Sequence, residues 1–184
     1  MNKIAGVVLA GGKSSRMGSD KSALTLNGIG LLEHMQSLLE SAKINDVFVS
    51  GKQGIVDLVP NQGPLMAILS CLKKMKQFHR VLFIPVDMPL LTPKIIKQLT
   101  DNICDDFVCY DGFNLPLLIK NTQTIRTKID KQIMKQQRSI HALLGQLNGN
   151  YIKRNCSEKH FINTNTPQQW QQAIKYFTTR PLKQ

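Results

Sequence analysis

The sequence lacks long apolar runs, paired cysteine motifs and a large aromatic content. No stretch approaches the roughly 20 apolar residues that a bilayer-spanning helix needs, so we expect no membrane partner. The four cysteines, Cys71, Cys104, Cys109 and Cys156, contain no C-x-x-C pair, which argues against a structural zinc site and favours reduced thiols. Aromatic residues make up only 6% of the chain, and no nucleic-acid recognition motif is visible, so base-stacking platforms are not expected.

At 184 residues the chain is long enough for one domain with a proper core and short for two. Its 42% apolar and 20% charged residues are typical of a globular protein. We therefore predict a single domain over residues 1–184, with a loose tail over residues 178–184. The N-terminus passes directly into an apolar run without the features of a signal peptide, which favours a cytoplasmic location.

Acidic residues are scarce in the C-terminal part of the chain. Residues 1–119 carry 12 Lys/Arg against 10 Asp/Glu, a balance of +2, whereas residues 120–184 carry 12 against 2, a balance of +10. Such a basic segment indicates either acidic partners, such as phosphates, nucleic acid or a membrane surface, or simply a solvated basic surface.

Short β-branched runs alternate with amphipathic stretches, which predicts an α/β domain with three αβα layers and a mostly parallel, Rossmann-like sheet. The expected strands are residues 4–10, 47–49 and 81–84, and the expected helices are residues 30–42, 64–76 and, in two pieces, 121–147.

Three further local patterns complete this prediction. Residues 107–110 and 115–119 are expected to form a small antiparallel element across a turn. Thr92 and Pro93 indicate a helix start. The last helix should begin at Thr166 with Gln169 as its capping-box partner.

The loop after the first strand carries the strongest functional signal. Paired glycines allow close approach of the backbone to a ligand, and the hydroxyls and cations that follow suit phosphate. Neither a Walker frame nor a G-x-G-x-x-G pattern fits these glycines. The predicted nucleotide-binding residues of this segment are Leu9, Ala10, Gly11, Gly12, Lys13, Ser14, Ser15 and Lys21.

Residues 11–21 match every defined position of the G-G-x-S-x-R-M-G-x-D-K signature and so resemble the MobA-like nucleotidyltransferases, the molybdenum cofactor guanylyltransferases. The resemblance extends over nearly the whole chain and implies a nucleotide-diphospho-sugar transferase-like fold. It also implies that this loop wraps a triphosphate, with Lys21 and Arg16 as catalytic residues.

A second signal is Asp87, directly beyond an apolar strand, at the sheet edge where ligands collect in parallel sheets. Magnesium prefers one or two carboxylates with phosphate oxygens and water, so Asp87 is a candidate for metal and nucleotide binding. An aspartate in a turn is also often a simple cap. The same family has a magnesium-binding aspartate in a comparable D-x-P segment, and the implied cofactor is Mg²⁺.

Other candidates lie in two segments. Asp57 offers a carboxylate that suits the adjacent N1–H and N2–H of guanine, and a surface turn is the alternative. Near the C-terminus, residues 161–167 resemble the family's F-x-N-x-N-T-P ending. This implies roles for Asn163 in metal binding and for Asn163 and Asn165 at the second substrate, and Arg138 resembles a basic residue that faces the pterin phosphate.

The sequence departs from the family where members often have a His-Pro pair, because Leu115 precedes Pro116 here. No histidine role is therefore carried over.

The implied reaction transfers GMP from GTP to the phosphate of molybdenum-molybdopterin, with release of pyrophosphate. Two alternatives remain: the same fold acting with CTP or on a sugar or alditol phosphate, and a non-catalytic nucleotide- or nucleic-acid-binding protein. We expect GTP and molybdopterin as small-molecule substrates, no nucleic-acid partner, and a monomer or weak homo-oligomer.

Overall fold

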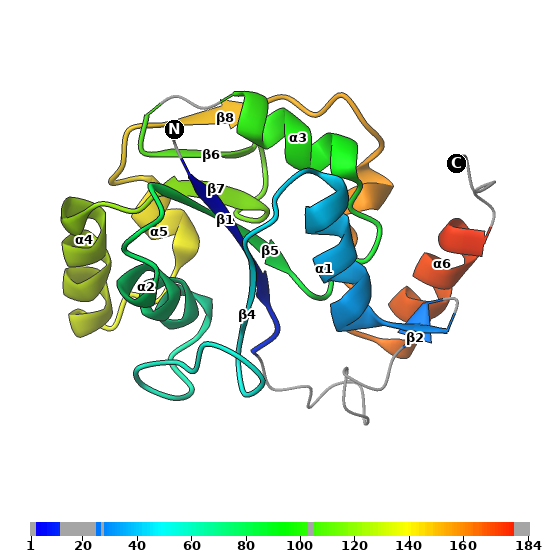
Figure 1. Cartoon of the computed structure of the whole chain (residues 1–184), viewed down its shortest axis with the longest axis horizontal. Helices are drawn as coiled ribbons and strands as arrows, with labels where there is room; N and C mark the ends of the chain where they lie inside the picture. Colours follow the sequence, from blue (N-terminus) through cyan, green and yellow to red (C-terminus); the bar gives the residue numbers. More distant parts are fainter. Residues whose placement is uncertain (1–2, 12–24, 27, 103–104, 179–184) are drawn as a thin grey trace.

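The computed structural model describes residues 3–11, 25–26, 28–102 and 105–178 (Figure 1). The predicted phosphate-loop residues from Gly12 to Lys21 lie outside this part of the chain, as do Cys104 and residues 179–184 of the predicted tail.

A six-stranded sheet in the order β4-β1-β5-β7-β6-β8 forms the centre of the molecule. Five strands are parallel, and β7 alone among the six runs antiparallel to both of its neighbours. A small antiparallel hairpin, whose two strands have two residues each, lies outside this sheet. The strands are β1 (Ile4–Leu9), β2 (Thr25–Leu26), β3 (Ile29–Gly30), β4 (Val47–Ser50), β5 (Arg80–Pro85), β6 (Phe107–Tyr110), β7 (Leu117–Lys120) and β8 (Gly149–Ile152).

Helices cover both faces of the sheet, which confirms the predicted three-layer α/β architecture (Figure 1). One face carries α2 (Pro64–Lys74), α4 (Gln123–Met134) and α5 (Ile140–Leu144), and the other carries α1 (Leu31–Ser41) and α3 (Pro93–Asp101). A 3₁₀ helix, η2 (Glu158–Phe161), precedes α6 (Pro167–Thr178). Trp170 of α6 packs against Leu26 and Leu31, so the last helix is anchored beside α1.

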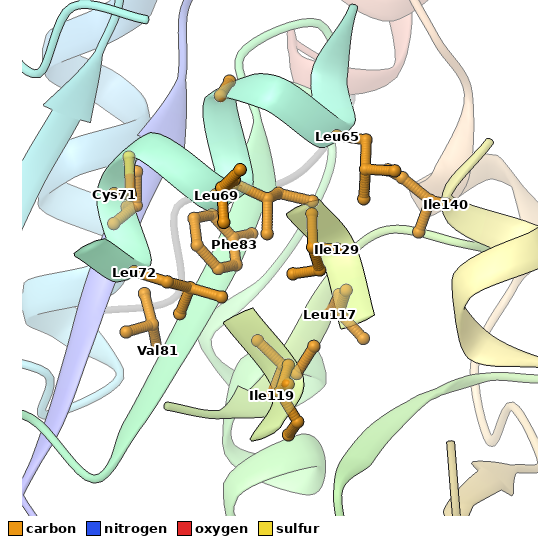
Figure 2. Packing of buried hydrophobic residues seen from close by; sticks show 14 of the residues in the cluster. Leu65, Leu69, Cys71, Leu72, Val81, Phe83, Leu117, Ile119, Ile129 and Ile140 are labelled. Carbon is orange, nitrogen blue, oxygen red and sulfur yellow. The ribbon is translucent and has the colours of Figure 1, made fainter. Parts of the chain in front are cut away.

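The central strands are continuous runs of apolar residues because both of their faces are buried under helices. In β5, Val81 and Phe83 face α2 and α4, whereas Leu82 and Ile84 face α1 and α3. Figure 2 shows Phe83 and Leu69 close together beneath α2. This alternation within an unbroken apolar strand is typical of a sheet covered by helices on both sides.

The predicted helix starts are confirmed by their capping hydrogen bonds. Thr92 Oγ1 accepts from the Ile95 N–H at 3.4 Å. At α6 the Gln169 N–H donates to Thr166 Oγ1 at 3.2 Å, and Gln169 Oε1 accepts from the Thr166 N–H at 3.0 Å, which completes a capping box.

Some predicted boundaries need correction. The strand expected over residues 115–119 is β7, Leu117–Lys120, because Pro116 has no N–H to donate to the sheet. β8, η2 and the β2–β3 hairpin were not predicted.

Three of the four cysteines lie within the described residues. Cys71, Cys109 and Cys156 are free thiols, as predicted. Among the helices of the described residues, none combines the length and the apolar character needed to cross a membrane.

Candidate nucleotide site

The site is built at the edge where the parallel strands β4, β1 and β5 end side by side (Figure 1). Backbone hydrogen bonds continue past the strands: the Ala10 N–H donates to the Ser50 carbonyl at 3.0 Å, and the Val86 N–H donates to the Leu9 carbonyl at 3.1 Å. Leu9 is buried, whereas Ala10 and Gly11 are exposed. The chain therefore enters the Gly-rich segment from a fixed, solvent-facing position.

Gly51 lies directly against the start of that segment, a feature that the sequence analysis missed. Its φ is +128°, a backbone conformation that other residues rarely adopt. A Cβ atom at Gly51 would lie 3.2 Å from the Gly11 nitrogen and 3.4 Å from the Ala10 carbonyl carbon. Position 51 therefore needs glycine for two reasons, its backbone conformation and its close approach to residues 10–11. A Gly two residues after the strand predicted over residues 47–49 was the available signal.

Asp57 lies in the loop between β4 and α2, and its carboxylate is partly buried. The Oδ1 atom is buried and has no hydrogen-bond partner within the part of the chain that the structure describes. Burial raises the pKa of Asp57 above that of an ordinary aspartate. A buried acceptor without a partner costs free energy, and such a group in a native structure calls for an explanation. Ligand donors that approach this oxygen would remove the cost.

The loop that carries Asp57 packs against β4 and α2. The Leu58 N–H donates to Ser70 Oγ at 2.9 Å, which ties the loop to α2. Ser50 and Cys71 are fully buried. Burial raises the pKa of Cys71 to about 11, against the smaller opposing effect of a hydrogen bond with the Ser50 side chain. The sequence analysis missed Ser50, although it directly follows the strand predicted over residues 47–49.

Asp87 follows β5 and meets the C-terminal segment that carries the two predicted asparagines. Its carbonyl accepts hydrogen bonds from the Thr164 N–H at 2.8 Å and from Thr164 Oγ1 at 3.1 Å. Asn163 is exposed and directly precedes Thr164, and Asn165 follows it with its N–H bound to Gln169 Oε1 at 2.9 Å. Residues 77 positions apart in the chain are thus brought together at the edge of the sheet.

Arg138 is exposed in the turn between α4 and α5. The turn is held by two hydrogen bonds of the next residue: the Ser139 carbonyl accepts from Gln132 Nε2 at 2.8 Å, and Ser139 Oγ caps α5 through the Ala142 N–H at 3.3 Å. Asn121, just before α4, bonds the carbonyl of Met75, just after α2, so α4 starts where α2 ends. The end of α4 and Arg138 therefore lie towards the edge where α2 begins.

Aromatic and cationic side chains pack the segment that follows Gly112. Phe113 packs against Phe161 with ring centroids 4.5 Å apart, and the Arg154 guanidinium lies over Phe113 at 5.0 Å. In the loop after β5, the Leu90 carbonyl accepts a hydrogen bond from His160 Nδ1 and the Pro89 carbonyl accepts one from His34 Nε2. These two histidines therefore hold the backbone of that loop.

Comparison with known proteins gives one consistent family. The model of the MobA-like NTP transferase domain matches residues 6–150. A molybdenum cofactor guanylyltransferase of Xanthomonas euvesicatoria is 36% identical over 176 residues, covering 92% of this chain and 93% of that protein. A probable molybdenum cofactor guanylyltransferase of Carboxydothermus hydrogenoformans is 27% identical and covers 98% and 100% of the two chains.

Solved structures agree on the fold. Molybdopterin-guanine dinucleotide biosynthesis protein A of Archaeoglobus fulgidus superposes with a TM-score of 0.77 at 20% identity, over 96% of this chain and 100% of that one. The 2-C-methyl-D-erythritol 4-phosphate cytidylyltransferase of Thermus thermophilus gives a TM-score of 0.66 at 13% identity, over 95% and 99%. With both its sequence and its sheet topology in agreement, this chain belongs to the MobA-like NTP transferase family, the family that its Gly-rich segment resembles.

Proposed function

We propose that this nucleotidyltransferase transfers GMP from GTP to the phosphate of molybdopterin and releases pyrophosphate. The family membership supports nucleotidyl transfer, and the name of the 36%-identical relative supports the guanylyl group and the acceptor. The observation in this structure that carries the base preference is the buried Oδ1 of Asp57, which no described residue hydrogen-bonds.

Guanine fits Asp57 better than the other bases do. Its N1–H and N2–H are adjacent donors that pair with the two oxygens of one carboxylate. Adenine, cytosine and uracil do not offer two such adjacent donors on one edge. A site built around a buried acceptor rejects ligands that leave this acceptor unpaired, and such discrimination is large.

The residues at Asp87 fit a magnesium ion. Among the described residues no cluster of three or more histidine, cysteine or acidic side chains forms a metal cage. One carboxylate and one nearby amide oxygen, from Asp87 and Asn163, are hard oxygen donors that leave positions for phosphate oxygens and water, which is the way Mg²⁺ is usually held beside nucleotides. When bound, the ion would neutralise charge on the triphosphate.

The chemistry then needs positioning more than proton transfer. The phosphate monoester oxygen of the acceptor attacks the α-phosphorus, a new P–O bond forms, and the bond from the α-phosphorus to the bridging oxygen breaks. The acceptor oxygen is already anionic, so no strong general base is required. The Gly-rich segment with Arg16 and Lys21 would hold the phosphates and offset the charge that develops on the pyrophosphate. Arg138, Asn163 and Asn165 would orient the acceptor.

A nucleotide panel tests the proposal. Purified protein is melted with GTP, CTP, ATP or UTP in the presence of Mg²⁺, and a reaction with GTP and molybdopterin is analysed for the dinucleotide and pyrophosphate. At a ligand concentration of 100 times Kd the expected stabilisation is about 2.7 kcal/mol, or roughly 5–10 °C in Tm for a chain of this size. A larger shift with CTP than with GTP would favour a cytidylyltransferase, and equal or absent shifts would contradict the guanylyl assignment.

A further inference from the structure

The backbone carbonyl of Asp87 receives two hydrogen bonds from a single residue. Thr164 donates its backbone N–H at 2.8 Å and its hydroxyl at 3.1 Å to the same oxygen. Thr164 is fully buried, with no exposed surface. Both donors of this buried threonine bind the same carbonyl oxygen. Together they fix the distance between the two backbone segments.

The rest of the loop after β5 is held in a similar way from two other elements. The Pro89 carbonyl lies 3.0 Å from Nε2 of His34 in α1, and the Leu90 carbonyl lies 2.8 Å from Nδ1 of His160 in η2. Three carbonyls within four residues are therefore bonded to side chains of distant segments. Of these contacts, the bond from Thr164 is made at Asp87 itself, and Thr164 is also the immediate neighbour of Asn163.

We propose that Thr164 is a positioning residue that sets the separation of the Asp87 carboxylate and the Asn163 amide, so that both oxygens serve one divalent cation beside the triphosphate. The proposal rests on the proposed function, since it assumes a metal at Asp87. Thr164 contacts the backbone of Asp87 and has no direct contact with the reacting atoms in this role.

The hydroxyl can be removed with little change of shape. The Thr164→Val variant keeps the backbone N–H bond to the Asp87 carbonyl but loses the hydroxyl bond. The Thr164→Ser variant keeps the hydroxyl and loses a methyl group. Thr100 on α3 offers a matched control, because its hydroxyl also donates to a backbone carbonyl, that of Lys97 at 2.9 Å. Thr100 lies at the end of α3 that is remote from Asp87.

The test is a titration of free Mg²⁺ at constant GTP, followed by Tm, on the wild type, Thr164→Val, Thr164→Ser, Thr100→Val and Asp87→Ala. We expect Thr164→Val to need about three- to tenfold more Mg²⁺ for half of the metal-dependent shift, in line with the loss of one neutral hydrogen bond. Thr164→Ser and Thr100→Val should remain within about twofold of the wild type on the same basis. Thr164→Ala, which also lacks the hydroxyl, gives the same comparison if valine does not fit.

The outcomes separate the inference from the function on which it rests. If Asp87→Ala abolishes the metal-dependent shift while Thr164→Val and Thr164→Ala leave the Mg²⁺ requirement unchanged, Thr164 is only a structural residue and the inference is wrong. A lower metal-free Tm with an unchanged Mg²⁺ requirement leads to the same conclusion. If Asp87→Ala keeps the full metal-dependent shift, the metal assignment in the proposed function is itself wrong.

Discussion

The replacement of Asp57 by asparagine isolates the contribution of this carboxylate to base recognition. The side chain keeps its shape but loses its charge, and its amide NH₂ then faces a guanine donor. Hydrogen bonds to a charged group contribute about 1.5–3 kcal/mol each. A total loss of about 3 kcal/mol, which corresponds to a rise of roughly 150-fold in the Kd for GTP, is therefore expected for two such bonds that are not fully additive.

Inosine triphosphate sharpens this experiment because it lacks the 2-amino group of guanine. The wild type should bind it about tenfold more weakly than GTP, the equivalent of one lost charged hydrogen bond of about 1.5 kcal/mol. Asp57→Asn should bind the two nucleotides with nearly equal affinity. The two proteins and the two nucleotides form a thermodynamic cycle, whose expected coupling energy of about 1.5 kcal/mol measures the interaction between the carboxylate and the amino group. Calorimetric titration is the assay.

The same substitution should leave the free protein at least as stable as before. Burial raises the pKa of Asp57, so the native state binds a proton more readily than the unfolded state does, and the ionised carboxylate increasingly opposes folding as the pH rises from the ordinary pKa of an aspartate through the raised one. Neutral asparagine removes this penalty at pH 7.5. Asp46→Asn is the matched control, because Asp46 pairs with Lys3 at 3.3 Å on the surface and lies outside the site.

Two results would refute this reasoning. One is a Kd for GTP in Asp57→Asn that equals the Kd in Asp46→Asn. The other is a fall in the Tm of the free protein together with an unchanged preference for GTP over inosine triphosphate. Either result would mean that the carboxylate supports the loop and does not recognise the base.

Further predictions concern the triphosphate, the loop contact, the pH and a helix end. Lys21→Ala and Asp87→Ala should each lower turnover by at least about 10²-fold with an unchanged circular dichroism spectrum; wild-type turnover of Asp87→Ala with Mg²⁺ would contradict the metal assignment. Gly51→Ala should weaken GTP binding and lower the Tm, because a Cβ there meets the Gly11 nitrogen at 3.2 Å; an unchanged Kd would show that residues 10–11 adapt. GTP binding should weaken as the pH falls towards the raised pKa of Asp57, since the carboxylate must be ionised to accept both guanine donors; a flat profile would speak against this. Gln136→Gly should raise the free energy of unfolding by roughly 0.5–1 kcal/mol, because Gln136 has a φ of 58° after α4; chemical denaturation measures it, and a loss of stability would refute it.

The sequence predicted those parts of the fold that are determined by continuous patterns along the chain. The buried strand β5 and the helix cap at Thr166 are each encoded by residues that are adjacent in the sequence, and both predictions are confirmed. β8 was missed because it is an edge strand in which only Ile152 is buried, and its residues 149–151 show no apolar alternation. It exists because the chain pairs with β6, and that pairing is a tertiary contact.

The candidate site divides in the same way. Asp87 was found because a carboxylate after an apolar strand is visible in the local sequence, and Asp57 because a carboxylate suits the adjacent donors of guanine. Their roles remain predictions. Thr164 was missed, because between two asparagines it gives no local signal, and its importance arises only from a contact to Asp87 across 77 positions. Gly51 was missed for a similar reason, since its close neighbour is the backbone of residues 10–11.

The two carboxylates of the candidate site are supported in different ways, and this difference carries a functional meaning. Asp57 has a buried oxygen with no hydrogen-bond partner among residues 3–11, 25–26, 28–102 and 105–178, a local cost that a bound base with two donors would remove. At Asp87 it is the backbone that is fixed, by two hydrogen bonds from buried Thr164. An unsatisfied acceptor favours base selection, because a ligand without matching donors leaves the free-energy cost of the buried oxygen in place. A fixed geometry favours metal binding, because Mg²⁺ accepts little deviation from octahedral coordination. Under the proposed function, the folded chain thus keeps an acceptor available at Asp57, where the base would be selected, and fixes the backbone at Asp87, where the metal would be held.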